Sequence, residues 1–274
     1  MKTAIKKLKT ATSYTLQPHT YPFLRRLIKS KITGESLSLN RTSKQATEWC
    51  KQRAVQPQAA LQQLCNQQSM TSLKDEFSDV IAEAEARVSS CPQQMGGGRH
   101  LDLVYNLCES FKARSILETG VAYGWSSLAM LLSLRNRTDS RLISTNLHYS
   151  RYEDDRYVGC AVPQDLRENW TLIKEADETA LPKALALMPS LDLCHYDSDK
   201  TYSGRMWAYS LLWQALKVDG CFISDDIHDN LAFTHFCQRL KQRPTVVEIP
   251  ASVGKKYVGV LVKRDDRVPK KIMF

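Results

Sequence analysis

Two apolar runs of the sequence end in acidic residues. LDLCHYDSDK places Asp197 directly after apolar residues, with Lys200 three positions later, and GCFISDD ends in Asp225 and Asp226. If these runs are neighbouring parallel strands, they lie about 4.8 Å apart and their carboxylates meet at one edge of a sheet. Carboxylates this close repel one another unless a cation or hydrogen bonds offset the repulsion. Oxygen ligands in this number favour Mg²⁺ or a similar ion over zinc.

The same acids have an alternative interpretation without metal. They could cap helices or pair with Arg205 and Lys217, and sites of this kind also occur in proteins that bind no cation. His195 precedes Asp197 by two positions and therefore shares its face of the strand. It either lines the same edge of the sheet or is a satisfied histidine of the core.

A glycine-containing turn follows a third apolar run, in SILETGVAYGWSS. The run ends at Glu118, and Gly120 allows a sharp turn and a close approach of the backbone to a ligand. Gly124 stands where a helix begins, with Ser126 as its candidate cap. The spacing differs from the GxGxxG of a pyrophosphate-binding loop. An acid before the turn suits a ligand with ammonium or hydroxyl donors, which favours S-adenosylmethionine over NAD. The alternative is that the motif is an ordinary strand–turn–helix junction that binds no ligand.

The segments around these motifs alternate between strands and helices. Short apolar runs at 115–118, 141–147, 170–176, 191–197 and 220–226 are predicted strands, and the segments 125–135, 164–169, 178–188 and 203–217 are predicted helices. This alternation indicates a parallel sheet with helices on both faces. Two strand-like runs within 245–264 predict a hairpin, which places an antiparallel strand at or near one edge. Ligands of such sheets bind beyond the carboxyl ends of the strands.

The motif ETGVAYGWSS resembles the first motif of class I S-adenosylmethionine-dependent methyltransferases, in the branch related to catechol, caffeoyl-CoA and sugar O-methyltransferases. The resemblance covers roughly residues 90–265. It implies a Rossmann-like, doubly wound α/β fold, with a mostly parallel seven-stranded sheet and an antiparallel C-terminal hairpin. It also implies that Glu118 and Gly120 line the methionine part of the cofactor and that Tyr123, Gly124 and Ser126 complete the turn.

In this family the second strand ends in an acid that receives the ribose hydroxyls of the cofactor. Here RLISTNL ends in Asn146, which carries no charge. Hydrogen bonds to an uncharged acceptor are weaker. We therefore expect either a lower cofactor affinity or help from a neighbour such as His148.

The resemblance also assigns roles to the acids at the strand ends. It implies that Asp197, Asp225 and Asp226 hold a divalent cation, Mg²⁺ or another, which binds the hydroxyls of the substrate. Asp197 would in addition bind the cofactor and take part in catalysis. Lys200 stands where catechol-type members have their general base, and a neighbouring cation would lower its pKa.

The net charge of +9 is unevenly distributed. Residues 1–60 hold twelve Lys and Arg against two Asp and Glu, whereas the remainder holds 26 against 27. A neutral body argues against nucleic acid as a partner. In YPFLRRLIKSKITG the apolar residues share one helical face and the cations the other, which predicts either peripheral contact with an anionic membrane or packing against its own domain or another subunit. With no secretory signal and no apolar run of about 20 residues, a cytoplasmic location is expected.

We therefore predict a basic, mostly helical N-terminal extension at 1–75 and a methyltransferase domain at 76–274. The expected enzyme is an O-methyltransferase for a small hydroxylated acceptor, such as a sugar, a glycan or glycolipid precursor or a natural product, in a monomer or a homo-oligomer. The alternative is a non-catalytic methyltransferase-like binding protein that docks through its basic N-terminus.

Overall fold

The computed structural model describes residues 35–92, 94–98, 100–148, 154–251 and 254–265, together with the isolated positions 21, 25, 28 and 32. Most of the basic sequence before residue 35 lies outside the described residues, and so does the helical face predicted for it. Membrane contact through this segment therefore stays a prediction.

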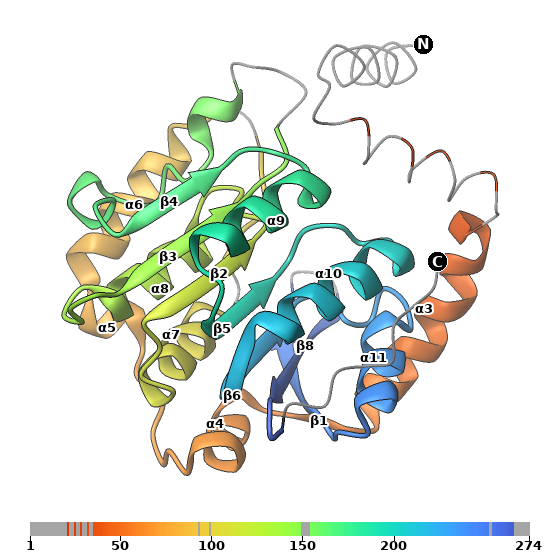
Figure 1. The fold of residues 1–274 in the computed structure, drawn as a ribbon. Helices are drawn as coiled ribbons and strands as arrows, with labels where there is room; N and C mark the ends of the chain where they lie inside the picture. The colour runs from red at the N-terminus through yellow and green to blue at the C-terminus, as the bar shows by residue number, and fades with distance from the viewer. Residues whose placement is uncertain are drawn as a thin grey trace.

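The described residues contain one eight-stranded sheet with helices on both faces (Figure 1). Its strands are β1 (Ala54–Val55), β2 (Ser115–Thr119), β3 (Arg141–Thr145), β4 (Trp170–Ile173), β5 (Leu191–Tyr196), β6 (Leu216–Ser224), β7 (Thr245–Pro250) and β8 (Lys255–Val262). Their spatial order is β1-β7-β8-β6-β5-β2-β3-β4, and β8 runs antiparallel to both of its neighbours while the other pairs are parallel. The predicted mixed α/β fold is confirmed, and the short strand β1 brings the sheet to eight strands instead of seven.

Helices connect most of the strands. They are α3 (Glu35–Lys51), α4 (Pro57–Cys65), α5 (Leu73–Glu76), α6 (Ser78–Ser89), α7 (Leu101–Ser110), α8 (Trp125–Leu134), α9 (Asp177–Leu187), α10 (Tyr202–Ala215) and α11 (Ala232–Leu240), with 3-10 turns η2 (Asp154–Tyr157) and η3 (Gln164–Leu166). The helix predicted at 164–169 is thus a 3-10 turn. Within the described part of the chain, every helix is too short or too polar to span a bilayer.

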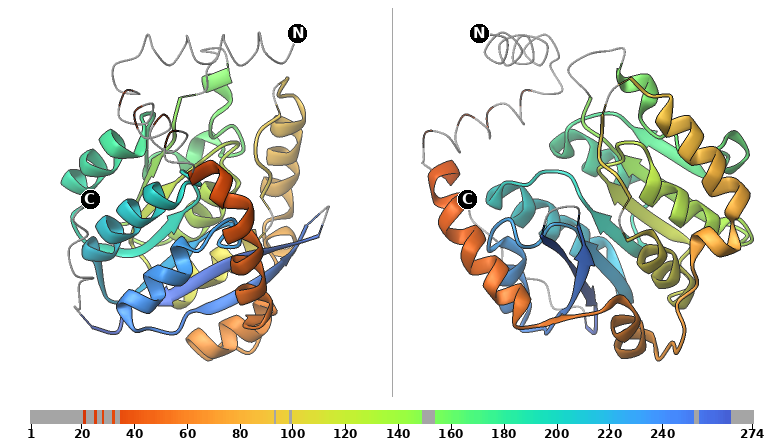
Figure 2. Two further views of the ribbon diagram at one scale, coloured as in Figure 1. Left: turned by 90° about the vertical axis from the view of Figure 1, so that its right-hand side faces the viewer. Right: turned by 180° about the vertical axis from the view of Figure 1, so that it is seen from behind.

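Alternating side chains along the strands divide the core into two layers. In β2, Ile116 packs with α4, α6, α7 and α8, whereas its neighbour Leu117 packs with α9, α10 and α11. Leu193 and Cys194 of β5 divide in the same way. The view from behind brings the gold helix α6 and the olive helix α7 to the front of the sheet (Figure 2, right). Because both faces of the sheet are buried, its strands appear in the sequence as unbroken apolar runs.

The described part of the N-terminal extension packs on the main domain. Helix α3 runs beside α11 (Figure 1), where the rings of Trp49 and Phe233 lie edge to face with centroids 6.5 Å apart. The Ser43 hydroxyl donates to the carbonyl of His228 at 3.2 Å. Strand β1 pairs with β7 and so joins the central sheet. The domain boundary at residue 75 stays a prediction, but residues 35–75 share the core of the domain that follows.

The order of the strands reverses between β2 and β5. The chain proceeds from β2 to β3 and β4 toward one edge, and from β5 to β6 toward the other. At such a point the connections on the carboxyl side leave in opposite directions and a crevice opens. The amide of Gly120 donates to Thr145 at 2.8 Å and the amide of Asp197 donates to Thr119 at 3.0 Å, so the residues just after β2 and β5 remain fixed to the sheet. The crevice lies directly above them.

Asp192 fixes the opposite end of the β2–β5 pair. Its Oδ2 atom accepts from the amides of Arg114 and Ser115, both at 2.9 Å, and its Oδ1 atom accepts from Lys217 at 2.6 Å. Partial burial acts against the charged form, but these three donors outweigh it and lower the pKa of Asp192.

We expect Asp192→Asn to lower the free energy of unfolding by about 1 kcal/mol at pH 7, because it removes the charge but keeps an acceptor oxygen. A lowered pKa stabilises the fold above the unfolded value of about 3.9, and this contribution is lost as the pH falls through the lower folded value. Urea unfolding should therefore show a smaller difference in the free energy of unfolding between the wild type and Asp192→Asn at pH 3 than at pH 7. Asp219→Asn, at a side chain that is 74% exposed, is the control; an equal effect of both variants would contradict the assignment.

Candidate active site

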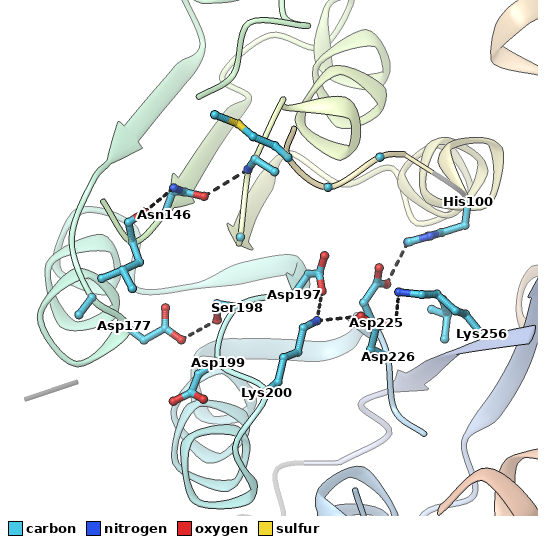
Figure 3. Close-up of a pocket in the computed structure, with 18 of the residues that line it drawn as sticks. His100, Asn146, Asp177, Asp197, Ser198, Asp199, Lys200, Asp225, Asp226 and Lys256 are labelled. Atoms are coloured by element: carbon cyan, nitrogen blue, oxygen red, sulfur yellow. Dashed lines mark hydrogen bonds and ion pairs between the residues drawn. The ribbon is translucent and has the colours of Figure 1, made fainter. Parts of the chain in front are cut away.

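The crevice at the switch point contains a cavity of about 660 Å³. Gly120, Ala122, Asn146, Asp197 and Asp225 are among the residues that line it. Figure 3 shows Asn146 on one side, with Asp197 and Asp225 apart from it. The volume of the cavity lies within the range of roughly 300–1,000 Å³ that is common for small-molecule sites. The turn after β2 and the acidic strand ends therefore line one cavity, as the sequence predicts.

Gly120 brings the ends of β2 and β5 together. Its φ is +81°, and a Cβ atom built on it would lie 2.3 Å from the carbonyl oxygen of Asp197. A side chain at this position would meet backbone, which cannot move aside as a flexible side chain can. Glycine is thus required here both for its left-handed conformation and for the close approach.

Asn146 holds the same turn from the end of β3. Its Oδ1 atom accepts from the amides of Val121 at 2.9 Å and Ala122 at 3.2 Å, and its Nδ2 donates to the carbonyl of Leu147 at 2.7 Å. The side chain also lines the cavity. The amide oxygen is therefore occupied by the protein's own backbone, which a sequence comparison at this position alone does not reveal.

Glu118 lies beneath the cavity and does not line it. Its side chain is fully buried, and its carboxylate accepts from the hydroxyls of Ser126, of Ser127 at 2.5 Å and of Ser144 at 2.6 Å. Ser126 is bonded to this carboxylate, and helix α8 has no side-chain cap; its N-cap residue is Gly124 in the left-handed conformation. The prediction that Ser126 caps the helix is wrong, because the buried charge of Glu118 attracts its hydroxyl.

The segment 158–162 supports the glycine turn from outside. Gly159 donates to the carbonyl of Ala122 at 2.9 Å, and Ala161 donates to that of Tyr123 at 2.8 Å. A Cβ atom on Gly124 would lie 2.8 Å from the Cα of Gly159. The Tyr123 hydroxyl accepts from the amide of Met95 at 3.0 Å. Tyr123 and Gly124 therefore fix the loops around the cavity.

Lys200 bridges two of the three predicted metal ligands. Its ammonium group contacts Asp197 and lies 3.1 Å from the Oδ2 of Asp226, whose Oδ1 accepts from Lys256 at 2.7 Å (Figure 3). Burial lowers the pKa of Lys200, but the charges of Asp197 and Asp226 outweigh burial and raise it. A lysine pKa lowered by a neighbouring metal cation stays a prediction; without such a cation, the two carboxylates favour the charged form of Lys200. Burial and the charge of Asp225 raise the pKa of Asp197 to about 6.

Asp225 faces two histidines. Its Oδ1 lies 2.9 Å from the Nε2 of His100 and 3.3 Å from the Nε2 of His195. Burial acts against the charged carboxylate, but these imidazoles outweigh it and hold the pKa of Asp225 well below its usual range. Burial also lowers the pKa of His195, but the hydrogen bond and charge of Asp225 raise it overall.

The three predicted ligands therefore have different partners. Asp226 adopts a left-handed backbone with φ of +50°, and its carboxylate pairs with Lys200 and Lys256. The place between Asp197 and Asp226 that a cation would take already holds the ammonium of Lys200. The residues as arranged do not fit a magnesium ion shared by Asp197, Asp225 and Asp226.

Comparisons with known proteins concern the fold that carries this cavity. Residues 117–227 match the family model of a methyltransferase domain. The fold matches Rv0187 from MTB, a cofactor-bound structure, with a TM-score of 0.53 and 17% identity over 73% of this chain and 100% of that one. It also matches the O-methyltransferase TomG from Streptomyces achromogenes (TM-score 0.51, 15% identity, 71% of this chain and 97% of that one) and PaMTH1 from Podospora anserina (TM-score 0.51, 15% identity, 81% and 96%). No match was found among curated proteins.

The chain has the fold of a class I methyltransferase. This confirms the resemblance predicted from ETGVAYGWSS. At identities of 13–17% the solved structures establish the fold, and activity is a separate question.

Within this methyltransferase fold the predicted residues fall into two groups. Those that line the cavity are Gly120, Asn146, Asp197, Lys200, Asp225 and Asp226. Glu118, Tyr123, Gly124 and Ser126 support it from below or outside. Sequence reasoning missed His100 and Lys256, which also line the cavity. His100 follows shortly after the run of three glycines at 96–98. Gly96 and Gly97 line the cavity, so this glycine run was the signal in the sequence that could have pointed to His100.

We expect Gly120→Ala to destabilise the methyltransferase fold more than Gly254→Ala. Both glycines have a left-handed φ, at +81° and +71°. Each alanine variant should therefore lose about 1–2 kcal/mol of unfolding free energy to backbone strain. A Cβ atom at Gly254 meets nothing within 4 Å, whereas at Gly120 it meets the Asp197 carbonyl. Urea midpoints of the two variants measure the difference. Equal midpoints would show that the β2 and β5 ends are not in contact.

Proposed function

We propose that this protein is an S-adenosylmethionine-dependent O-methyltransferase for a small hydroxylated acceptor. The observation that carries the proposal is the cavity between the glycine turn and the ends of β5 and β6. Solved structures of the same fold are described as complexes: TomG with S-adenosylmethionine and PaMTH1 with S-adenosylhomocysteine. A sugar, a glycan or glycolipid precursor or a natural product are all acceptors of the required size.

Gly120, Ala122, Asn146 and Asp177 would hold the cofactor, since they line the cavity along the ends of β2, β3 and β4. Asp177 is fixed there by the hydroxyl of Ser198, which donates to its Oδ2 at 2.5 Å. When bound, S-adenosylmethionine supplies a methyl group on a positively charged sulfur. Acidic side chains attract the sulfonium and ammonium groups of such a ligand. The glycine leaves backbone groups of the turn accessible to it.

Asp197 and Lys200 would act on the acceptor hydroxyl. The Asp197 carboxylate faces the cavity and is within reach of a proton leaving that hydroxyl, which makes it the proposed general base. The ammonium of Lys200, held by Asp197 and Asp226, would stabilise negative charge on the acceptor oxygen. This exchanges the roles expected from the sequence, because a lysine between two carboxylates keeps its proton. No step is assigned to a magnesium ion.

Binding of S-adenosylhomocysteine by isothermal titration tests the proposal without knowledge of the acceptor. We expect one molecule per chain for the wild type. Asn146→Ala removes the acceptor of two backbone hydrogen bonds in the turn, each worth about 1 kcal/mol, and should weaken binding by roughly 30-fold. Asn146→Asp keeps an acceptor oxygen for both bonds and should bind within a few-fold of the wild type. Absence of binding by the wild type would favour a non-catalytic protein that docks through its basic N-terminus.

Asp197→Asn tests the catalytic assignment. It removes the proposed base while nearly preserving shape, and we expect kcat to fall by about 10²–10⁴-fold. Release of S-adenosylhomocysteine with a panel of sugars and hydroxylated phenols measures turnover. Asp219→Asn, at an exposed residue near the start of β6, is the control and should behave as the wild type. Undiminished turnover by Asp197→Asn would rule out this residue as the base.

A further inference from the structure

His100, His195 and Asp225, here called the His–His–Asp cluster, come together from three elements. His100 is the N-cap residue of α7, His195 lies in β5, and Asp225 follows β6. Among the residues that the structure describes, these form a group of three metal-ligating side chains whose donor atoms all lie within 4.8 Å of one another. Figure 3 shows His100 and Asp225 pointing toward each other at the wall of the cavity.

We propose that the His–His–Asp cluster binds a divalent transition-metal ion. Two imidazoles and one carboxylate suit Zn²⁺, Fe²⁺, Mn²⁺ or Co²⁺ better than Mg²⁺, which prefers oxygen ligands throughout. Three protein ligands leave at least one coordination position open. That position would face the cavity, because His100 and Asp225 line it.

The spacing of the donor atoms agrees with coordination. Bonds of about 2.0–2.1 Å in a tetrahedral site place the ligand atoms roughly 3.3 Å from one another. The Asp225 oxygen lies 2.9 Å from His100 Nε2 and 3.3 Å from His195 Nε2. A metal ion would therefore enter with small side-chain movements, without a change in the backbone.

The buried imidazole of His195 is a second and independent observation. The residue is 1% exposed, and its Nδ1 has no hydrogen-bond partner among the described residues. Buried polar atoms without partners are rare and call for an explanation. Metal bound at the Nε2 of His195 would fix the proton of this imidazole on Nδ1, which faces the Glu118 carboxylate at 3.9 Å. A carboxylate behind a histidine ligand is a common arrangement in metal sites.

The cluster is distinct from the three-aspartate site expected from the sequence. It shares only Asp225 with that site, while Lys200 and Lys256 neutralise Asp226. Without metal, the cluster is a set of histidine–carboxylate ion pairs. The two states differ in metal content, so the proposal can be tested whether or not the protein transfers methyl groups.

The test is Co²⁺ binding by the full, untagged chain after removal of metal with a chelator, followed by visible absorption and by metal content after dialysis. We expect one Co²⁺ per chain and a visible band for the wild type. His100→Ala, at a partly exposed residue whose loss should not prevent folding, should weaken binding by more than about 100-fold, since even partners of metal ligands contribute about 10–100-fold. His195→Ala should do the same, and circular dichroism checks that it folds.

His235→Ala is the matched control, because His235 lies in α11 and its Nδ1 pairs with the Tyr202 hydroxyl at 3.0 Å. It should bind Co²⁺ as the wild type does. No binding by the wild type, or unchanged affinity in folded His100→Ala, would overturn the proposal. Loss of Co²⁺ in Asp226→Asn with retention in His100→Ala would overturn it too, and would place the metal among the aspartates.

Discussion

The cavity depends on one buried charge, the carboxylate of Glu118. An ionised carboxylate at zero exposure is destabilising by several kcal/mol unless hydrogen bonds satisfy it. The hydroxyls of Ser126 and Ser127 in α8 and of Ser144 in β3 do so, and in this way the charge fixes the start of the helix to two strands. Satisfying Glu118 thus determines where the glycine turn can lie.

This network extends beyond Glu118 to the outer support of the turn. Ser144 also accepts from the indole of Trp170 at 2.8 Å. A Cβ atom on Gly159 would lie 2.3 Å from the Trp170 ring, so the ring packs directly on this glycine. Gly159 in turn donates to the carbonyl of Ala122, in the turn itself. A chain of contacts therefore runs from the buried carboxylate to the cavity wall, and each member limits the movement of the next.

The sequence predicts most of the fold because its strands are buried on both faces and have few alternatives. An apolar run such as 220–224 does not alternate between apolar and polar residues as a half-exposed strand does, and the alternation of strands with helices then leaves the parallel sheet. Strand β1 was missed because two residues carry no periodicity. The residues at the carboxyl ends of the strands were also predictable, since the sheet alone brings Gly120 and Asp197 to one edge.

The partners of those residues were less predictable, because they come from segments with no motif. Lys200 is close to Asp197 in the sequence, but its ammonium group also pairs with Asp226, which lies 26 positions further along the chain. His100 approaches from the start of α7, 125 positions before Asp225. Acids at strand ends therefore indicate an ionic site. Whether a lysine ammonium or a metal ion balances their charge depends on which side chains the fold packs beside them. In this molecule Asp197 and Asp226 pair with a lysine, whereas Asp225 faces two imidazoles. The acids at the ends of β5 and β6 therefore form two sites of different chemistry.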